Sequence, residues 1–374
     1  MSCTQVVTDE EEVFITEEEE TAPTEEQWTG EFLQVDIGTN LEIVGVIDFI
    51  QDPGYRLTGA ESGAIALTDP CVVQLPDGRY RMYTSAQIPD IIEGSAMDIY
   101  SFVSSDGISW AWEEGARVAH SSNEEDQDHN LGVPAVFQGT DSRWYMTMSA
   151  RRPFTEEEEE TAPPDRRRHI TLMPAVSDDG LNWTKYPDKL FPGPDIWAIN
   201  GDAIVIDDQY ILYYGSPYNS GAGQWQAIST NGINWETKGP VFNFGHDPDV
   251  IEYRGQYYMF YVYEVSETVL SQLTDIDPEM AKSLAERAEL EEALGKNYRK
   301  LILLAVSDDG LVWSNKQYII RPLTPSGEDY WSLKMLPPGG PFATVLPDGQ
   351  FILYGGMHTD LDKVISFRPV NELP

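Results

Sequence analysis

The chain has 374 residues, of which 63 are Asp or Glu and 24 are Lys or Arg, so its formal net charge is −39. This charge disfavours binding to nucleic acid or to an anionic membrane surface, because like charges repel. Hydrophobic residues make up 41% of the chain, which is enough for a substantial core and excludes wholesale disorder. The 11% of aromatic residues, together with 30 Gly and 25 Pro, favours short strands and many turns.

Residues 1–30 are rich in acids and contain no Lys or Arg, so we expect a flexible acidic tail. Cys3 and Cys71 are too few for a disulfide framework, and no apolar run is long enough to span a bilayer. If a signal peptide is removed ahead of it, Cys3 could carry a lipid anchor; the alternative is a solvated tail with an incidental cysteine. We therefore expect an extracellular or cell-surface location.

A short pattern ending in Gly-x-x-Trp occurs four times along the chain. Asp-Gly or Asn-Gly supplies the positive φ of a tight hairpin turn, and the Trp that follows can pack back across the hairpin. The four copies are Ser105–Trp110, Ser177–Trp183, Ser229–Trp235 and Ser307–Trp313. Such a repeat indicates a protein built from similar β-sheets.

Two of the gaps between these hairpins contain insertions. Residues 154–169 are Glu-rich and then Arg-rich, and residues 272–299 predict a helix that could act as a lid or a surface for self-association. Without them, the spacing fits one four-stranded sheet per repeat. A fifth strand pair at 342–354 lacks the Trp hairpin. The sequence predicts an all-β fold for residues 31–374, a five-bladed β-propeller with the helical insertion in blade four, closed by a strand from residues 33–47.

Three acidic residues stand near the starts of predicted innermost strands, at what we expect to be the same structural step: Asp69, Asp202 and Asp247. Innermost strands converge on the central channel, so these carboxyl groups should be neighbours in space. Clustered carboxyl groups have pKa values that separate, and glycoside hydrolysis needs one carboxylate and one carboxylic acid. The alternative is a structural role, because Asp before Pro is a common turn residue.

Four segments resemble blades of glycoside hydrolase family 43 and its relatives. They are Asp69–Tyr83 for the first blade, Asn200–Ser216 for the third, Asp247–Tyr258 for the fourth and Pro338–Tyr354 for the fifth. The resemblance covers roughly residues 45–370. It implies that Asp69 is the general base, that Asp202 orients the acid and tunes its pKa, and that Asp247 is the general acid. Family members act on arabinans, xylans and related sugars, usually with inversion.

Other residues are candidates for binding. Four aromatic side chains in loops on or near the channel face could stack on sugar rings or pack between blades: Trp197, Tyr218, Trp225 and Trp331. His246 is a further substrate-binding candidate. The acidic run with Asp126, Asp128 and His129 could hold Ca²⁺, although such a run is more often a solvated loop. No cofactor is required by this interpretation.

Two functions follow from these observations. The first is an enzyme that cleaves a glycosidic bond of an oligo- or polysaccharide by carboxylate acid–base catalysis. The second is a non-catalytic surface propeller that binds glycans or assembles with other proteins.

Overall fold

The structure is a computed structural model, and it describes residues 41–89, 96–161, 168–192, 198–216, 223–294, 300–333, 339–357 and 360–374. The chain divides into two units, Met1–Val35 and Asp36–Pro374, and all of the described residues belong to the second. The acidic tail with Cys3, and the candidates Trp197 and Tyr218, lie outside the described residues.

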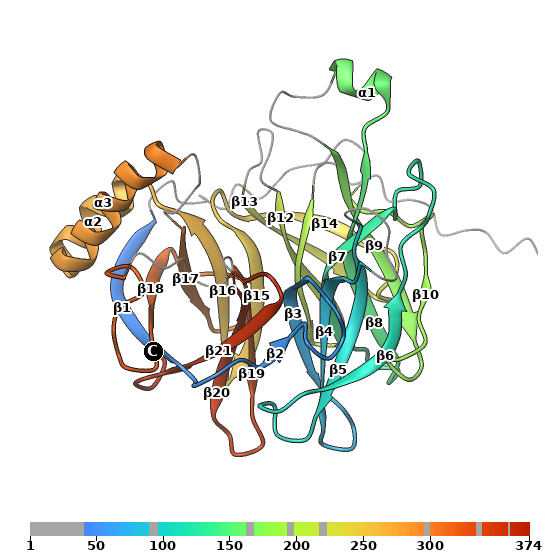
Figure 1. Cartoon of the computed structure of the whole chain (residues 1–374), viewed down its shortest axis with the longest axis horizontal. Helices are drawn as coiled ribbons and strands as arrows, with labels where there is room; N and C mark the ends of the chain where they lie inside the picture. The colour runs from blue at the N-terminus through green and yellow to red at the C-terminus, as the bar shows by residue number, and fades with distance from the viewer. Residues whose placement is uncertain are drawn as a thin grey trace, which may run out of the picture. The chain divides into compact units, whose positions relative to one another are not determined.

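The described residues form mainly β-structure (Figure 1). Three antiparallel sheets have four strands each, which is the size expected for propeller blades. The first contains β3 (Ala66–Gln74), β4 (Tyr80–Gln87), β5 (Asp98–Ser104) and β6 (Ala111–Val118). The second contains β7 (Asn130–Gln138), β8 (Trp144–Pro153), β9 (Arg168–Ser177) and β10 (Thr184–Lys185). The third contains β11 (Ile199–Ile206), β12 (Gln209–Ser216), β13 (Gly223–Ser229) and β14 (Glu236–Phe242).

The remaining strands join in one larger sheet. Its members are β15 (His246–Tyr253), β16 (Gln256–Glu264), β17 (Lys300–Ser307), β18 (Lys316–Leu323), β1 (Glu42–Gln51), β21 (Lys363–Pro369), β20 (Phe351–Gly356) and β19 (Gly339–Val345), and β2 (Leu57–Thr58) pairs with β21. The strand expected from residues 33–47 starts at Glu42 and pairs antiparallel with β21 over three residues. It also pairs parallel with β18, which the sequence analysis did not predict.

The first strand of each sheet segment contacts the first strand of the next. The contacts run from β3 to β7, from β7 to β11, from β11 to β15, from β15 to β19 and from β19 back to β3. Segments far apart in the sequence therefore meet at the starts of these five strands.

The four Gly-x-x-Trp segments form the predicted turns. Gly107 has φ +73°, and the equivalent glycines have φ between +68° and +72°. In the first copy, the Asp106 carboxylate accepts hydrogen bonds from the backbone N–H of Ile108 and Ser109, at 2.8 Å each. The Trp110 indole N–H donates to the Gly107 carbonyl at 3.2 Å, so this Trp does pack back over its turn.

The region expected to form a single helix at 272–299 contains two helices. Two helices, α2 (Glu267–Ile276) and α3 (Pro278–Leu294), lie between β16 and β17, and the short α1 (Glu156–Thr161) lies between β8 and β9. The break falls at Pro278, because proline has no N–H to continue the first helix but is well suited to the first position of the next. None of the described helices is long and apolar enough to cross a membrane.

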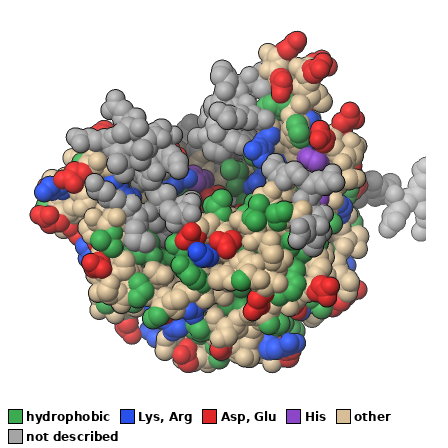
Figure 2. All heavy atoms as spheres, in the orientation of Figure 1, with side chains coloured by type: hydrophobic (Ala, Val, Ile, Leu, Met, Phe, Trp, Pro, Cys, Tyr) green, Lys and Arg blue, Asp and Glu red, His purple; other side chains and the backbone are tan. Residues whose placement is uncertain are grey.

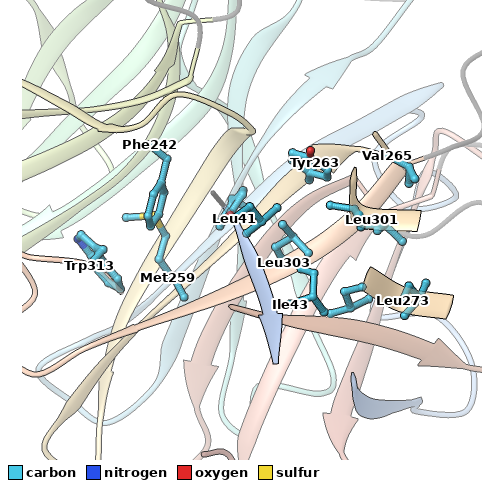
Figure 3. Close-up of a cluster of buried hydrophobic side chains, with 14 of the residues drawn as sticks. Leu41, Ile43, Phe242, Met259, Tyr263, Val265, Leu273, Leu301, Leu303 and Trp313 are labelled. Atoms are coloured by element: carbon cyan, nitrogen blue, oxygen red, sulfur yellow. The ribbon is translucent and has the colours of Figure 1, made fainter. Parts of the chain in front are cut away.

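Helix α2 is attached to β1 by a polar and an apolar contact. The Gln272 side chain accepts from the Ile43 N–H at 2.6 Å and donates to the Leu41 carbonyl at 2.7 Å. Leu273 is fully buried and packs in the cluster that includes Leu41, Ile43 and Leu301 (Figure 3). Burying a Leu side chain contributes roughly 1.5–3 kcal/mol, so the helix is held by its core face.

Candidate active site

Each of the five first strands has a register shift close to its start. The shifts lie between Thr68 and Cys71 in β3, Gly132 and Ala135 in β7, Asn200 and Asp202 in β11, His246 and Asp249 in β15, and Gly339 and Phe342 in β19. In four strands two residues are looped out and the second of them is proline, whereas β11 loops out one glycine. These β-bulges redirect the backbone toward the common centre.

The looped-out residues adopt an unusual backbone conformation. Asp69, Val133, Asp247 and Gly340 have φ between +49° and +55°. Asp tolerates this left-handed region better than most residues, and glycine has no Cβ to clash, but a β-branched residue there is an outlier. Val133 therefore carries local strain of the kind that clusters at functional sites.

The bulges line one small pocket. Its volume is about 20 Å³, which is space for about one water molecule. The lining residues are Asp69, Pro70, Val133, Pro134, Gly201, Asp247, Pro248, Asp249, Gly340, Pro341 and Phe342. The structure thus brings Asp69 and Asp247 together.

Asp202 does not share the step of Asp69 and Asp247, and the expectation of three equivalent acids is wrong on this point. Asp202 is opposite Tyr213, as Asp249 is opposite Phe260, and both are the first paired residue after a bulge. The reason is that β11 loops out a single residue, which places Asp202 one step further along its strand. Its true counterpart is Asp249, which the sequence analysis did not select although it follows Asp247 in the motif Asp-Pro-Asp.

Asp69 is half-buried and accepts hydrogen bonds from two hydroxyl groups. Its Oδ2 accepts from the Thr68 hydroxyl at 2.8 Å and from the Ser85 hydroxyl at 3.1 Å. Burial, followed by the charge of Asp247, raises the pKa of Asp69, and the two hydroxyl groups and Arg151 offset this only in part. A proton is therefore held more tightly on Asp69 than on an ordinary carboxyl group.

Asp247 has the opposite surroundings. Burial works to raise its pKa, but the nearby cations His246, Lys300 and Arg151 bring the pKa of Asp247 below its ordinary value. The His246 Nδ1 lies 3.0 Å from the Asp247 Oδ2, and the two side chains are 21% and 24% exposed. His246, which the sequence analysis selected as a substrate-binding candidate, is thus the ion-pair partner of Asp247.

Asp202 and Asp249 form a deeper acidic pair, only 5% and 2% exposed. The Val250 N–H donates to Asp202 at 3.1 Å, and the Ala343 N–H donates to Asp249 at 2.8 Å. Burial raises the pKa of Asp202 to about 7. Burial and the charge of Asp202 raise the pKa of Asp249 well above its ordinary value. This pair therefore keeps a proton at neutral pH.

Arg151 is a further residue that the sequence analysis missed. It is partly buried near the end of β8, and its Nε is enclosed and has no hydrogen-bond partner among the described residues. Burial lowers its pKa, while the charges of Asp69 and Asp247 act to raise it. No motif marked this arginine, because its importance comes from the neighbouring strand and not from its own sequence context.

The two described aromatic candidates are packed in the interior. Trp331 is 1% exposed and belongs to the hydrophobic cluster that contains Leu273 and Leu284, so its ring is not open to a sugar. Trp225 is partly buried and packs against the cluster that contains Tyr214. Both fit the packing alternative in the sequence analysis.

The calcium candidates have protein partners of their own. Asp126 accepts from the Ser121 hydroxyl at 2.6 Å and from the Asn123 amide at 2.9 Å. Asp128 is paired with Lys185, and His129 Nδ1 lies 3.1 Å from the Ser121 carbonyl. Within the part of the chain that the structure describes, no three His, Cys, Asp or Glu side chains are grouped as metal ligands.

Comparison with solved structures finds the same fold in propeller glycoside hydrolases. A thermostable family-43 glycoside hydrolase is 19% identical with a TM-score of 0.53, and the alignment covers 86% of this chain and 91% of that one. A family 117 glycoside hydrolase from the marine bacterium Zobellia galactanivorans is 15% identical with a TM-score of 0.54, covering 87% and 90%.

A third similar structure comes from the GH130 family of mannoside phosphorylases, which contains glycoside hydrolases that target β-1,2 mannosidic linkages in Candida mannan. It is 13% identical with a TM-score of 0.55, covering 90% of this chain and 99% of that one. No family model matches the sequence. No curated protein matches it. At these identities the likeness establishes the β-propeller glycosidase fold.

Proposed function

We propose that this protein is a glycosidase-type enzyme that cleaves a glycosidic bond at the pocket between Asp69 and Asp247. The observation that carries the proposal is the pair itself, two carboxyl groups on one pocket with pKa values shifted in opposite directions. Environments that push two acids apart in pKa are the requirement for acid–base cleavage of a glycoside.

The electrostatic surroundings favour one assignment of roles. Asp69, with the raised pKa, is the proton donor to the glycosidic oxygen, and Asp247, held ionised beside His246, takes a proton from the attacking water. Water adds to the anomeric carbon as the bond to the leaving alcohol breaks. The family-43 resemblance implies the reverse roles, so this assignment is open to a direct test. Asp202 is a positioning residue here, because it holds the backbone of β15 through Val250.

The architecture in this proposal is a five-bladed propeller. The support is the closed circuit of contacts between β3, β7, β11, β15 and β19, each of which opens one group of strands. In that arrangement β15 to β18 are the fourth blade, with α2 and α3 as its insertion, and β19 to β21 with β1 are the fifth. An oligo- or polysaccharide substrate fits an extracellular setting, which cell fractionation would test.

The experiment is a panel of arabinan, xylan and aryl glycosides, assayed with the full chain and with Asp69→Asn and Asp247→Asn. We expect each substitution to reduce kcat/KM on the active substrate by roughly 10²–10⁴-fold. Asp126→Asn is the matched control, because that acid lies in an exposed loop outside the pocket. Unchanged activity in both pocket variants would contradict the proposal.

A leaving-group comparison tests the roles. A dinitrophenyl glycoside releases dinitrophenolate, a stable anion that departs without a proton, so loss of the general acid is tolerated and loss of the general base is not. We expect Asp69→Asn to retain far more activity on this substrate than on the parent glycan, and Asp247→Asn to lose activity on both. The opposite pattern would support the roles that the resemblance implies.

A second function, glycan binding without cleavage, is favoured by the size of the pocket. The described bulge residues leave about 20 Å³, space for about one water molecule, so a sugar would lie across the open mouth of the pocket and could be held there without reaching both acids. Saturable sugar binding with no turnover on the panel would support this alternative.

A further inference from the structure

A second pocket lies beside the acidic one and has the opposite charge. Its volume is about 230 Å³, and three of its lining residues are arginines. The described residues that line it include no acid: Ala96, His129, Asn130, Arg151, Arg152, Pro153 and Arg168. In Figure 2, blue and purple side chains gather below the red cluster of α1, on a surface where red side chains are common. The chain has 24 Lys and Arg residues, and three of them line this one pocket.

The three arginines are held differently. Arg152 is fixed by two hydrogen bonds from its guanidinium to Glu158, at 2.6 and 2.7 Å. Arg168 is exposed at the start of β9. Arg151 is partly buried, and its Nε finds no partner among the described residues. Guanidinium groups that line a pocket are suited to a planar or tetrahedral oxyanion, because they present several N–H donors in one plane.

Arg151 connects this pocket to the acidic one. Arg151 pairs in register with Asn130, and Val133, in the acidic pocket, is three positions further along β7. Three positions along a strand span about 10 Å, which is within reach of a short oligosaccharide. A Cβ on Gly132, between them, would stand 3.3 Å from the Arg151 guanidinium and 3.2 Å from the Ser85 hydroxyl that contacts Asp69. Glycine therefore gives the guanidinium room beside the strand.

We propose that the three-arginine pocket binds the acidic group, a carboxylate or a sulfate ester, of a glycan whose glycosidic bond lies between Asp69 and Asp247. This inference rests on the proposed function for its substrate and on the arginines for its charge. The overall negative charge of the chain disfavours free polyanions at long range, but contacts inside a pocket act at short range where screening is weak. The protein would then select acidic sugars over neutral ones.

Calorimetric titration of the full chain with three probes tests the proposal: D-glucuronate, D-glucose 6-sulfate and D-glucose, at equal ionic strength. We expect the pocket to bind at least one acidic sugar about tenfold more tightly than glucose, and Arg168→Gln to remove about tenfold of that affinity. Arg79→Gln is the matched control, because Arg79 is an exposed arginine paired with Asp77 in the β3–β4 turn, at the other end of the strand from Asp69. Which acidic sugar binds identifies carboxylate or sulfate as the source.

Equal binding of acidic and neutral sugars, no binding of either acidic sugar, or acidic binding unaffected by Arg168→Gln would each overturn the proposal. Inorganic phosphate is the fourth probe in the titration. If phosphate binds in the three-arginine pocket and turnover yields a sugar phosphate, then phosphate is a co-substrate and the proposal is wrong. Turnover of neutral aryl glycosides is measured separately. Turnover without selective acidic binding removes this inference alone, whereas acidic binding without turnover on any substrate removes the enzyme proposal alone.

Discussion

The mouth pair Asp69 and Asp247 and the deep pair Asp202 and Asp249 contain the same side chains on neighbouring strand positions, yet their protonation differs. In the mouth pair one pKa is raised and the other is lowered. In the deep pair both are raised. The difference lies in the cations: His246, Lys300 and Arg151 act on Asp247, whereas the donors to the deep pair among the described residues are the backbone N–H groups of Val250, Ala343 and Ala203.

This contrast teaches that the bulge separates two kinds of acid. A residue inside the bulge lies beside the cations that act on the pocket, and a residue just after it is more deeply buried and accepts hydrogen bonds from backbone N–H groups. The residue type alone does not decide between a group that can exchange protons with a substrate and a group that keeps its proton.

The largest expected effect concerns the deep pair and stability. Because the folded pKa of Asp202 is about 7, the native protein keeps a proton that the unfolded chain releases near pH 4. Stability contributed by this group is complete below pH 4 and is lost as the pH rises to about 7. We expect the wild type to lose on the order of 2 kcal/mol more than Asp202→Asn between pH 5 and pH 8.

Urea unfolding at both pH values measures this difference. Asp309→Asn is the matched control, because Asn231 already occupies the equivalent turn position in another repeat and the pKa of Asp309 is lowered rather than raised. If Asp202→Asn and the wild type change in parallel between the two pH values, the deep pair does not hold its proton and the comparison fails.

The next effect concerns the cation beside the mouth pair. Removing the charge of His246 should raise the pKa of Asp247, since the imidazolium is the strongest of the groups that lower it. If Asp247 must be ionised for catalysis, the acidic limb of the kcat/KM profile moves to higher pH in His246→Ala, by about one pH unit or 1.4 kcal/mol.

His246→Asn separates charge from hydrogen bonding in the same experiment. Asparagine can still donate to the Asp247 carboxylate but carries no charge. A limb that moves equally in both variants indicates that the charge matters, and a limb that moves only in His246→Ala indicates that the hydrogen bond does. An unmoved limb in both would contradict the electrostatic assignment of Asp247.

Much of the fold was predictable because its signals are local. The Gly-x-x-Trp turns depend on residues within six positions, such as Asp106, Gly107 and Trp110, and the structure shows their hydrogen bonds. The helix at 272–299 was placed correctly in part, but its start at Glu267 and its break at Pro278 were missed. The parallel pairing of β1 with β18 joins segments too far apart for a local pattern to specify.

The site was predictable only as far as its repeat was regular. Asp69 and Asp247 each precede a proline in the same motif, so their shared position could be predicted from sequence. Asp202 was assigned to the wrong step because β11 has Gly201 alone where the other strands have two residues. Arg151 depends on which strand lies next to β7, and only the fold supplies that neighbour.

The smallest expected effect tests whether the bulge conformation itself costs stability. Val133 occupies the bulge position of Asp69 and Asp247 with φ +49°, which β-branched residues adopt only under strain. Asparagine adopts this region readily, so Val133→Asn should stabilise the protein by about 1 kcal/mol. Val133→Ala is the control, because it removes the methyl groups and gains none of that tolerance. A higher urea midpoint in Val133→Asn and a lower one in Val133→Ala would assign the cost to the backbone, whereas two lower midpoints would show that packing of the valine outweighs its strain.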